Sequence, residues 1–72
     1  MKTSIEQNIG LIWNVSQKFS GKGVDEIELF QLGCIGFRKA SSTYDEESGI
    51  EFSTYAMRLI DGEIKRSLGI VF

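Results

Sequence analysis

No proline occurs in this chain, and its apolar residues recur every three or four positions instead of alternating with polar ones. Such spacing places the apolar side chains on one side of a helix, whereas a half-buried strand needs strict alternation. A chain of 72 residues can build a single hydrophobic core and no second one. We therefore expect one all-α domain over residues 1–72, folded as a compact bundle of three main helices.

Breaks rich in glycine and small polar residues divide the chain into the expected helices, over about residues 3–19, 25–42 and 53–68. Side chains that can accept hydrogen bonds from the free N–H groups at a helix start belong to Thr3, Asp25 and Ser53. Residues typical of helix exits and turns are Gly21, Gly23, Asp45, Ser48 and Gly49. The helices should therefore be joined by two short connections.

Each expected helix has one side suited to burial. In the first helix this side is formed by Ile5, Ile9, Ile12, Val15 and Phe19. In the second it is formed by Leu29, Gly33, Gly36 and Ala40, where the glycines allow a neighbouring helix to approach closely. In the third it is formed by Ala56, Ile60, Ile64 and Ser67, with Met57 and Leu68 at its edge. The opposite, polar side of the third helix should face outward and consists of Arg58, Asp61, Gly62 and Lys65.

Charge is unevenly distributed, although the net charge is only −2. Residues 25–51 contain seven acidic side chains against two basic ones, while the flanking segments are mildly basic. So little positive charge argues against a protein that simply coats phosphates. The acidic segment is either a solvated surface or one of two faces that bind different partners.

Catalytic and metal-binding side chains are scarce. The chain has no histidine and a single cysteine, Cys34, so we expect neither a metal site nor an internal disulfide. No nucleophile–base pair and no phosphate-binding P-loop occurs, so we expect no enzyme and no cofactor. Glu6 and Asn8 precede any apolar run, so we expect no signal peptide or membrane anchor and a reducing, cytoplasmic setting.

The stretch EFSTYAMRLIDGEIKR (51–66) begins with rings and hydroxyl groups. Phe52 and Tyr55 lie at the expected start of the third helix, where free N–H groups and the helix dipole favour phosphate. Stacking one base on a ring contributes about 1–3 kcal/mol, which is similar to the few kcal/mol that extruding a base from a duplex costs. The rings therefore either hold single-stranded nucleic acid or belong to the core, and composition alone favours the core.

The segment LFQLGCIGFRKASSTYDEESGIEFSTYAMRLIDGEIKR resembles the second conserved region of bacterial sigma factors of the sigma-70 family. The family pattern is D-L-[IF]-Q-x-G-x-I-G-L-x-K-A, a spacer that ends in Phe or Tyr and an acid, and then F-S-T-Y-A. The matching residues, in register, are Glu28, Leu29, Phe30, Gln31, Gly33, Ile35, Gly36, Lys39, Ala40, Tyr44, Asp45 and residues 52–56. The resemblance covers residues 8–67, and the GEIKR ending is similar to alternative factors of spore-forming bacteria.

This resemblance implies a role in transcription initiation, because sigma factors bring RNA polymerase to promoters. In the family, the second helix binds a basic coiled coil of the polymerase β′ subunit, which suits the acidic segment. The implied polymerase-binding positions are Glu28, Gln31, Leu32, Cys34 and Arg38. The third helix recognises the promoter −10 element and captures bases of its non-template strand during melting. The implied DNA-binding positions are Asn8, Leu11, Phe52, Thr54, Tyr55, Arg58, Asp61, Gly62 and Lys65.

Three departures from the family pattern change what the resemblance implies. Arg58 and Leu59 stand where housekeeping factors carry a Trp pair that wedges the duplex open, which implies weaker melting. Glu51 replaces a basic residue beside the DNA, and Gly62 replaces a Gln that reads a base edge. The promoter preference of those factors therefore cannot be transferred to this chain.

A complete sigma factor has a further domain for the −35 element, and this sequence does not supply one. Three accounts stay open: an excised fragment, one half of a split factor with a separate −35-binding subunit, or a remnant that binds polymerase or an anti-sigma factor without recognising DNA alone. A generic helix-turn-helix domain is disfavoured because the third helix is nearly neutral. Exposure of Phe52 and Tyr55 should distinguish DNA capture from a purely protein-binding module.

Overall fold

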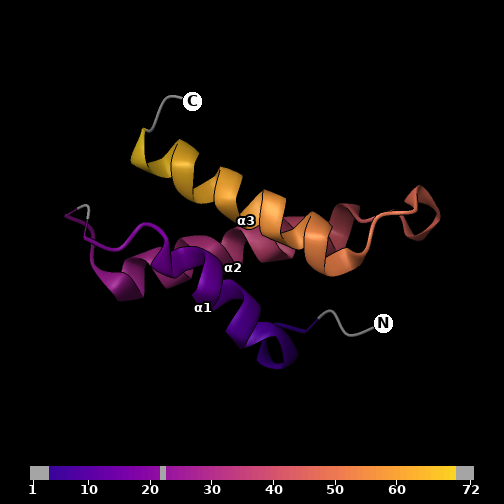
Figure 1. Ribbon diagram of the computed structural model, residues 1–72, viewed down its shortest axis with the longest axis horizontal. Helices are drawn as coiled ribbons and strands as arrows, with labels where there is room; N and C mark the ends of the chain where they lie inside the picture. The colour runs from indigo at the N-terminus through magenta and orange to yellow at the C-terminus, as the bar shows by residue number, and fades with distance from the viewer. Residues whose placement is uncertain (1–3, 22, 70–72) are drawn as a thin grey trace.

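The computed structural model describes residues 4–21 and 23–69. They form three α-helices, α1 (Ile9–Gln17), α2 (Glu26–Thr43) and α3 (Phe52–Leu68), and two 3-10 turns, η1 (Glu6–Asn8) and η2 (Glu46–Ser48). No strand occurs in these ranges, and the expected all-α bundle of three main helices is confirmed. Each pair of α-helices is in contact, and the molecule is a thin slab of 38 × 27 × 15 Å (Figure 1).

α2 and α3 cross closely at Gly36. A Cβ atom at Gly36 would lie 2.7 Å from the Cα of Ile60 and 2.8 Å from the carbonyl oxygen of Leu59. At Gly33 a Cβ would lie 2.8 Å from Ile12 Cγ2 of α1 and 2.8 Å from Ser16 Oγ. The predicted role of the two glycines, to allow close approach of neighbouring helices, is confirmed.

One continuous core joins the helices. Its buried apolar residues are Ile12, Val15, Phe19, Leu29, Phe37, Ala40, Ala56, Ile60 and Ile64. Ser16 is buried among them, and its hydroxyl donates to the Ile12 carbonyl oxygen at 2.8 Å, so its polar atom is satisfied. Burying a large aliphatic or aromatic side chain contributes about 1.5–3 kcal/mol. Burial of these residues is therefore the main favourable contribution to the free energy of folding.

The helix ends agree with the sequence in part. Asp25 caps α2, because its carboxylate accepts from the Ile27 N–H at 3.0 Å. The exit from α1 contains Gly21 and Gly23, whose φ angles of +84° and +82° favour glycine. The cap predicted at Thr3 lies outside the described residues. The cap predicted at Ser53 is wrong: α3 begins at Phe52, and Glu51, in extended conformation, is the residue before it.

Two predicted core positions are also wrong. Ile9, the first residue of α1, is 49% exposed. Ser67 is exposed and Leu68 is half-buried instead. The buried line of α3 runs in steps of four residues, and a contact that follows such a ridge continues to position 68, not 67.

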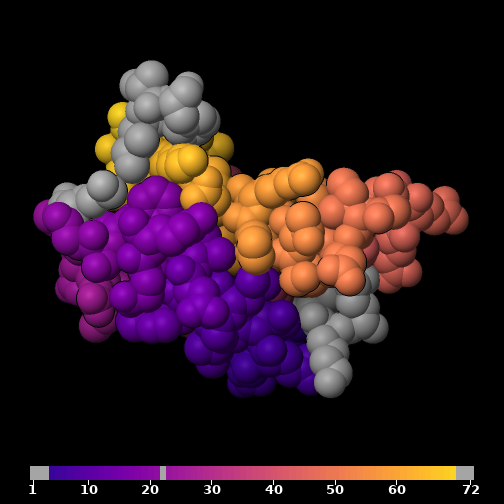
Figure 2. Space-filling model, in the orientation of Figure 1, coloured from indigo at the N-terminus to yellow at the C-terminus, as the bar shows by residue number. Residues whose placement is uncertain are grey.

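The connection between α2 and α3 forms one end of the slab. It projects beyond the helices as the salmon-coloured segment in Figures 1 and 2. The Asp45 carboxylate accepts from the Glu47 N–H at 2.9 Å, and the Ser48 hydroxyl oxygen accepts from the Ile50 N–H at 3.2 Å. The predicted turn is therefore confirmed, and it delivers the chain to the first residues of α3.

Candidate nucleic-acid and protein interfaces

Four aromatic rings form a row that runs from the core to the start of α3. Phe37, which is 1% exposed, meets Phe52 edge-on with ring centroids 5.6 Å apart. Phe52 then meets Tyr44 at 5.2 Å, and Tyr44 meets Tyr55 at 5.6 Å. Phe52, Tyr44 and Tyr55 are half-buried. Phe52 and Tyr55 both pack against the core, and Tyr55 is the last ring in this series of contacts.

Hydroxyl groups fix the outer rings. The Tyr44 hydroxyl donates to the Ile50 carbonyl oxygen, which ties α2 to the loop before α3. The Tyr55 hydroxyl lies 2.6 Å from Thr43 Oγ1 at the end of α2. Thr54, in the first turn of α3, is half-buried. The start of α3 thus presents the ring and the hydroxyl group of Tyr55. Contacts with Tyr44 and Thr43, at the end of α2, set their orientation.

The polar side of α3 is less open than predicted. Arg58 is exposed, whereas Asp61, Gly62 and Lys65 are half-buried. Asp61 forms ion pairs with Lys65 (2.9 Å) and with Lys18 (3.4 Å), which follows α1. Burial raises the pKa of Asp61, but the hydrogen bonds and charges of the two lysines outweigh it and hold the pKa below its usual value. A cavity of about 230 Å³ lies here, lined by Lys18, Thr54, Met57, Arg58 and Asp61.

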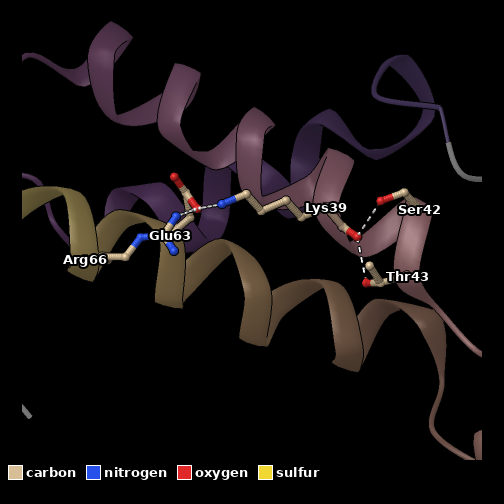
Figure 3. A network of polar contacts seen from close by, with 5 residues as sticks. All are labelled: Lys39, Ser42, Thr43, Glu63 and Arg66. Atoms are coloured by element: carbon tan, nitrogen blue, oxygen red, sulfur yellow. Dashed lines mark hydrogen bonds and ion pairs between the residues drawn. The ribbon is translucent and has the colours of Figure 1, made fainter.

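A second carboxylate on α3 binds α2 (Figure 3). Glu63 Oε1 accepts from Lys39 Nζ at 2.7 Å and from Arg66 Nη2 at 2.5 Å, and its side chain is only 10% exposed. The hydrogen bond from Lys39 lowers the pKa of Glu63; burial opposes it, and the Arg66 guanidinium adds to the lowering. The carbonyl oxygen of the same Lys39 accepts from the hydroxyls of Ser42 and Thr43.

The outer side of α2 carries a shallow groove of about 510 Å³. Its lining residues are Ile27, Phe30, Gln31, Cys34, Ile35 and Arg38. Ile27 is 67% exposed and Ile35 is 41% exposed, and Phe30 contacts the ring of Trp13 on α1 (centroids 5.8 Å apart). Burial raises the pKa of the Cys34 thiol, and the charge of Arg38 opposes this more weakly.

The structure places three of the five predicted polymerase-binding residues in this groove. Gln31, Cys34 and Arg38 line the groove, Glu28 is exposed and Leu32 is half-buried. Sequence reasoning missed the apolar residues Ile27, Phe30 and Ile35. Their position could have been found from helix geometry, because Ile35 lies about 200° around the helix from Gly33 on the buried side.

The predicted DNA-binding residues are distributed over two parts of the chain. Phe52, Thr54, Tyr55, Arg58, Asp61, Gly62 and Lys65 all belong to α3. Asn8 and Leu11 are half-buried on η1 and α1, where the Asn8 amide donates to the Ser4 carbonyl oxygen at 2.9 Å. Sequence reasoning missed Lys18 and Thr43, which contact α3 residues from other segments. Spacing within one helix gives no signal for such pairs.

Within residues 4–21 and 23–69, His, Cys, Asp and Glu side chains form no cluster suited to a metal ion. In the same part of the chain, no helix combines the length and hydropathy needed to cross a bilayer. The groups available for binding are therefore rings, hydroxyls, charges and the apolar groove.

Comparison with known proteins gives a consistent result. The family model described as Sigma-70 region 2 matches residues 4–69. The chain is 45% identical to the RNA polymerase sigma-F factor of Bacillus subtilis (strain 168) over 86% of its length, and 42% identical to that of Priestia megaterium over 89%. It is 42% identical to the RNA polymerase sigma-G factor of Clostridium acetobutylicum, also over 89% of its length.

The chain spans about a quarter of these relatives, 24% or 25% of their lengths. No solved structure matches it significantly. The resemblance predicted from the F-S-T-Y-A motif and the sequence before it is confirmed, as is the similarity to sporulation-type alternative factors. This chain belongs to the sigma-70 family, and it corresponds to the family's region 2.

Proposed function

We propose that this chain is the part of a transcription initiation factor that binds the RNA polymerase core and recognises the promoter −10 element. The outer side of α2 binds the β′ coiled coil, and the start of α3 captures bases of the non-template strand. The observation that carries this proposal is the row of rings from Phe37 to Tyr55, which ends half-buried at the first turn of α3 in a member of the sigma-70 family.

The groove on α2 supports the polymerase part of the proposal. It combines apolar side chains with Gln31 and Arg38, and Glu28 lies exposed on the same helix. Interfaces of this kind have an apolar centre with polar groups around it, and a basic partner is favoured by the acids of α2. A coiled coil offers ridges of side chains that fit a groove between helical residues.

A titration against a β′ coiled-coil fragment tests this interface. Gln31→Ala and Glu28→Lys should each weaken binding, with the helix content measured by circular dichroism unchanged. Gln17→Ala, an exposed glutamine at the end of α1, is the matched control and should bind like the wild type. Equal affinity of wild type, Gln31→Ala and Glu28→Lys would remove α2 as the polymerase-binding surface.

The start of α3 supports the DNA part. Tyr55 offers a ring for stacking, and the free N–H groups of the first helical turn favour a phosphate. Few cations are near, so affinity for DNA should be weak, and its dependence on salt should be shallow. An unpaired strand should bind better than a duplex, because no stacking energy is used to open base pairs.

Fluorescence anisotropy with a −10-like oligonucleotide tests base capture, with and without the β′ fragment. The non-template strand should bind better than its complement or the duplex. Tyr55→Ala should remove most of this preference, because about 1–3 kcal/mol of stacking per base is lost. Equal binding of all three nucleic acids, or a Tyr55→Ala variant that matches the wild type, would contradict base capture.

A second function, protein binding without DNA recognition, is favoured by one observation. Phe52 packs edge-on against Phe37 and Tyr44 and so has a structural role whether or not DNA binds. In that case the chain is a remnant or one half of a split factor that binds polymerase or an anti-sigma factor. The two titrations separate these functions, because the strand preference would then be absent whether or not the β′ fragment binds.

A further inference from the structure

Oxygen atoms of Lys39 and Thr43 on α2 and of Tyr55 on α3 form a chain of hydrogen bonds. The Thr43 hydroxyl donates to the Lys39 carbonyl oxygen at 2.7 Å, as Figure 3 shows. Thr43 Oγ1 also lies 2.6 Å from the Tyr55 hydroxyl oxygen. Thr43 therefore connects the backbone of α2 to the Tyr55 ring on α3.

The donor and the acceptor of each hydrogen bond follow from the number of hydroxyl hydrogens. A threonine hydroxyl has one hydrogen, and here it is used toward Lys39. The hydrogen between the two hydroxyls must then come from Tyr55, which donates to Thr43 Oγ1. The Tyr55 hydroxyl is left with acceptor lone pairs only, so toward any ligand it acts as a ring with an acceptor at its edge.

Two contacts from α2 and its end hold the same ring. The Tyr44 ring lies against it, with centroids 5.6 Å apart, and Thr43 holds its hydroxyl. A side chain that is fixed before binding loses less conformational entropy when a base stacks on it. Lys39, which accepts the hydrogen bond from Thr43, is itself joined to α3, because its Nζ binds Glu63.

We propose that Thr43 is a positioning residue: its hydroxyl holds the Tyr55 ring in the orientation in which a flipped base stacks on it. This inference rests on the proposed base capture and adds to it a residue that does not touch the base itself. The inference requires a hydroxyl group at position 43, which accepts a hydrogen bond from Tyr55 and donates one to Lys39.

A double-mutant cycle on strand binding tests this role. Thr43→Val removes the hydroxyl and keeps the shape, and Tyr55→Phe removes its partner and keeps the ring. Each should weaken binding of the non-template −10-like strand about two- to tenfold, since one ring is no longer fixed before binding. Combining them should cost no more than either alone, because both remove the same hydrogen bond.

Two further variants separate positioning from a general effect on the fold. Thr43→Ser keeps the hydroxyl and should bind like the wild type. Ser42→Ala is the matched control, since Ser42 donates to the same Lys39 carbonyl at 3.1 Å from the neighbouring position. Side-chain couplings measured by NMR in the free protein should report one χ1 rotamer for Tyr55 in the wild type and averaging in Thr43→Val.

The outcomes distinguish this inference from the proposal beneath it. If the wild type prefers the non-template strand but Thr43→Val binds it equally well, or if the two losses add, positioning by Thr43 is wrong and base capture stands. If the wild type shows no strand preference, base capture fails and the positioning role fails with it. A Tyr55 rotamer that is unchanged in Thr43→Val also overturns the positioning role.

Discussion

The two ends of α3 are held to the bundle by different chemistry. At the N-terminal end the contacts are made by rings and hydroxyls, where Phe52 and Tyr55 meet Phe37, Tyr44 and Thr43. In the C-terminal half Ile60 and Ile64 pack in the core, and carboxylates add ion pairs with lysines of other segments. The N-terminal end keeps a half-buried aromatic face. In the C-terminal half the carboxylates are already paired with other residues of the protein. A polar helix side is therefore not by itself a binding surface.

The two carboxylates of the charged half also differ. Glu63, with its side chain 10% exposed, joins α3 to Lys39 of α2, whose side chain is 49% exposed. Asp61, with its side chain 24% exposed, joins α3 to Lys18 beside the cavity near Arg58. We expect that substitution of Glu63 changes mainly the free energy of unfolding. Substitution of Asp61 should change mainly the number of lysines that can bind a DNA phosphate.

The largest expected effect comes from Gly36, because both ends of α3 depend on the crossing there. Gly36→Ala places a methyl group against the backbone of Leu59 and Ile60, and should lower the free energy of unfolding by about 1–3 kcal/mol or more. Gly10→Ala, in α1 with open space around it, is the control and should raise stability by up to about 1 kcal/mol. Urea unfolding followed by circular dichroism measures both. Similar values for the two variants would contradict the close crossing.

A smaller effect is expected from Glu63→Gln, which removes the charge that joins Lys39 to α3. The free energy of unfolding at neutral pH should fall by about 1 kcal/mol. Because the fold lowers the pKa of Glu63, its contribution is complete above the ordinary value of 4.5 and is lost as the pH falls through the lower folded value. The wild type should therefore lose more stability than Glu63→Gln between neutral and acid pH.

Urea unfolding over a series of pH values measures this difference. Glu47→Gln, an exposed position in η2, is the control and should follow the wild type. Parallel pH dependence of all three proteins would mean that the Lys39–Glu63 pair contributes nothing to the α2–α3 contact.

The smallest effect on stability is expected from Asp61→Asn, below about 1 kcal/mol, because Lys18 is largely exposed. Its effect should appear in DNA binding, since Lys18 and Lys65 lose a competing carboxylate. Affinity for the non-template strand should rise, and the slope of log K against log salt should steepen by about 0.7 for each lysine that reaches a phosphate. Glu26→Gln, an exposed acid at the start of α2, is the control for the charge change. An unchanged slope would place both lysines away from the DNA.

Features that depend on one segment could be predicted from the sequence. The Asp25 cap and the glycine exit of α1 follow from local chemistry, and the stripe with Gly33 and Gly36 follows from helix geometry. The start of α3 was placed one residue late, at Ser53. Phe52 belongs to the helix although no side chain caps it, because its ring packs between Phe37 and Tyr44.

Features that depend on two segments could not be predicted in this way. The pairs Lys18–Asp61 and Thr43–Tyr55 join residues of different segments, and their distance depends on how the helices cross. The family resemblance suggested the residues of both proposed surfaces, since it carries information about a complete fold. It gave no indication that Asp61 is held by Lys18 or that Tyr55 is held by Thr43.

The two glycines of α2 differ in which second mutations could repair their loss. The atoms that a methyl group would meet at Gly33 belong to the side chains of Ile12 and Ser16, whereas those at Gly36 belong to the backbone of α3. A suppressor screen should therefore recover Gly33→Ala together with smaller residues at position 12 or 16. No side-chain change removes a backbone atom, so Gly36→Ala should yield no suppressor in the facing helix. Position 36 therefore cannot change stepwise to a larger residue while α2 and α3 keep this crossing. A homologous chain with a side chain at this position must cross its helices differently.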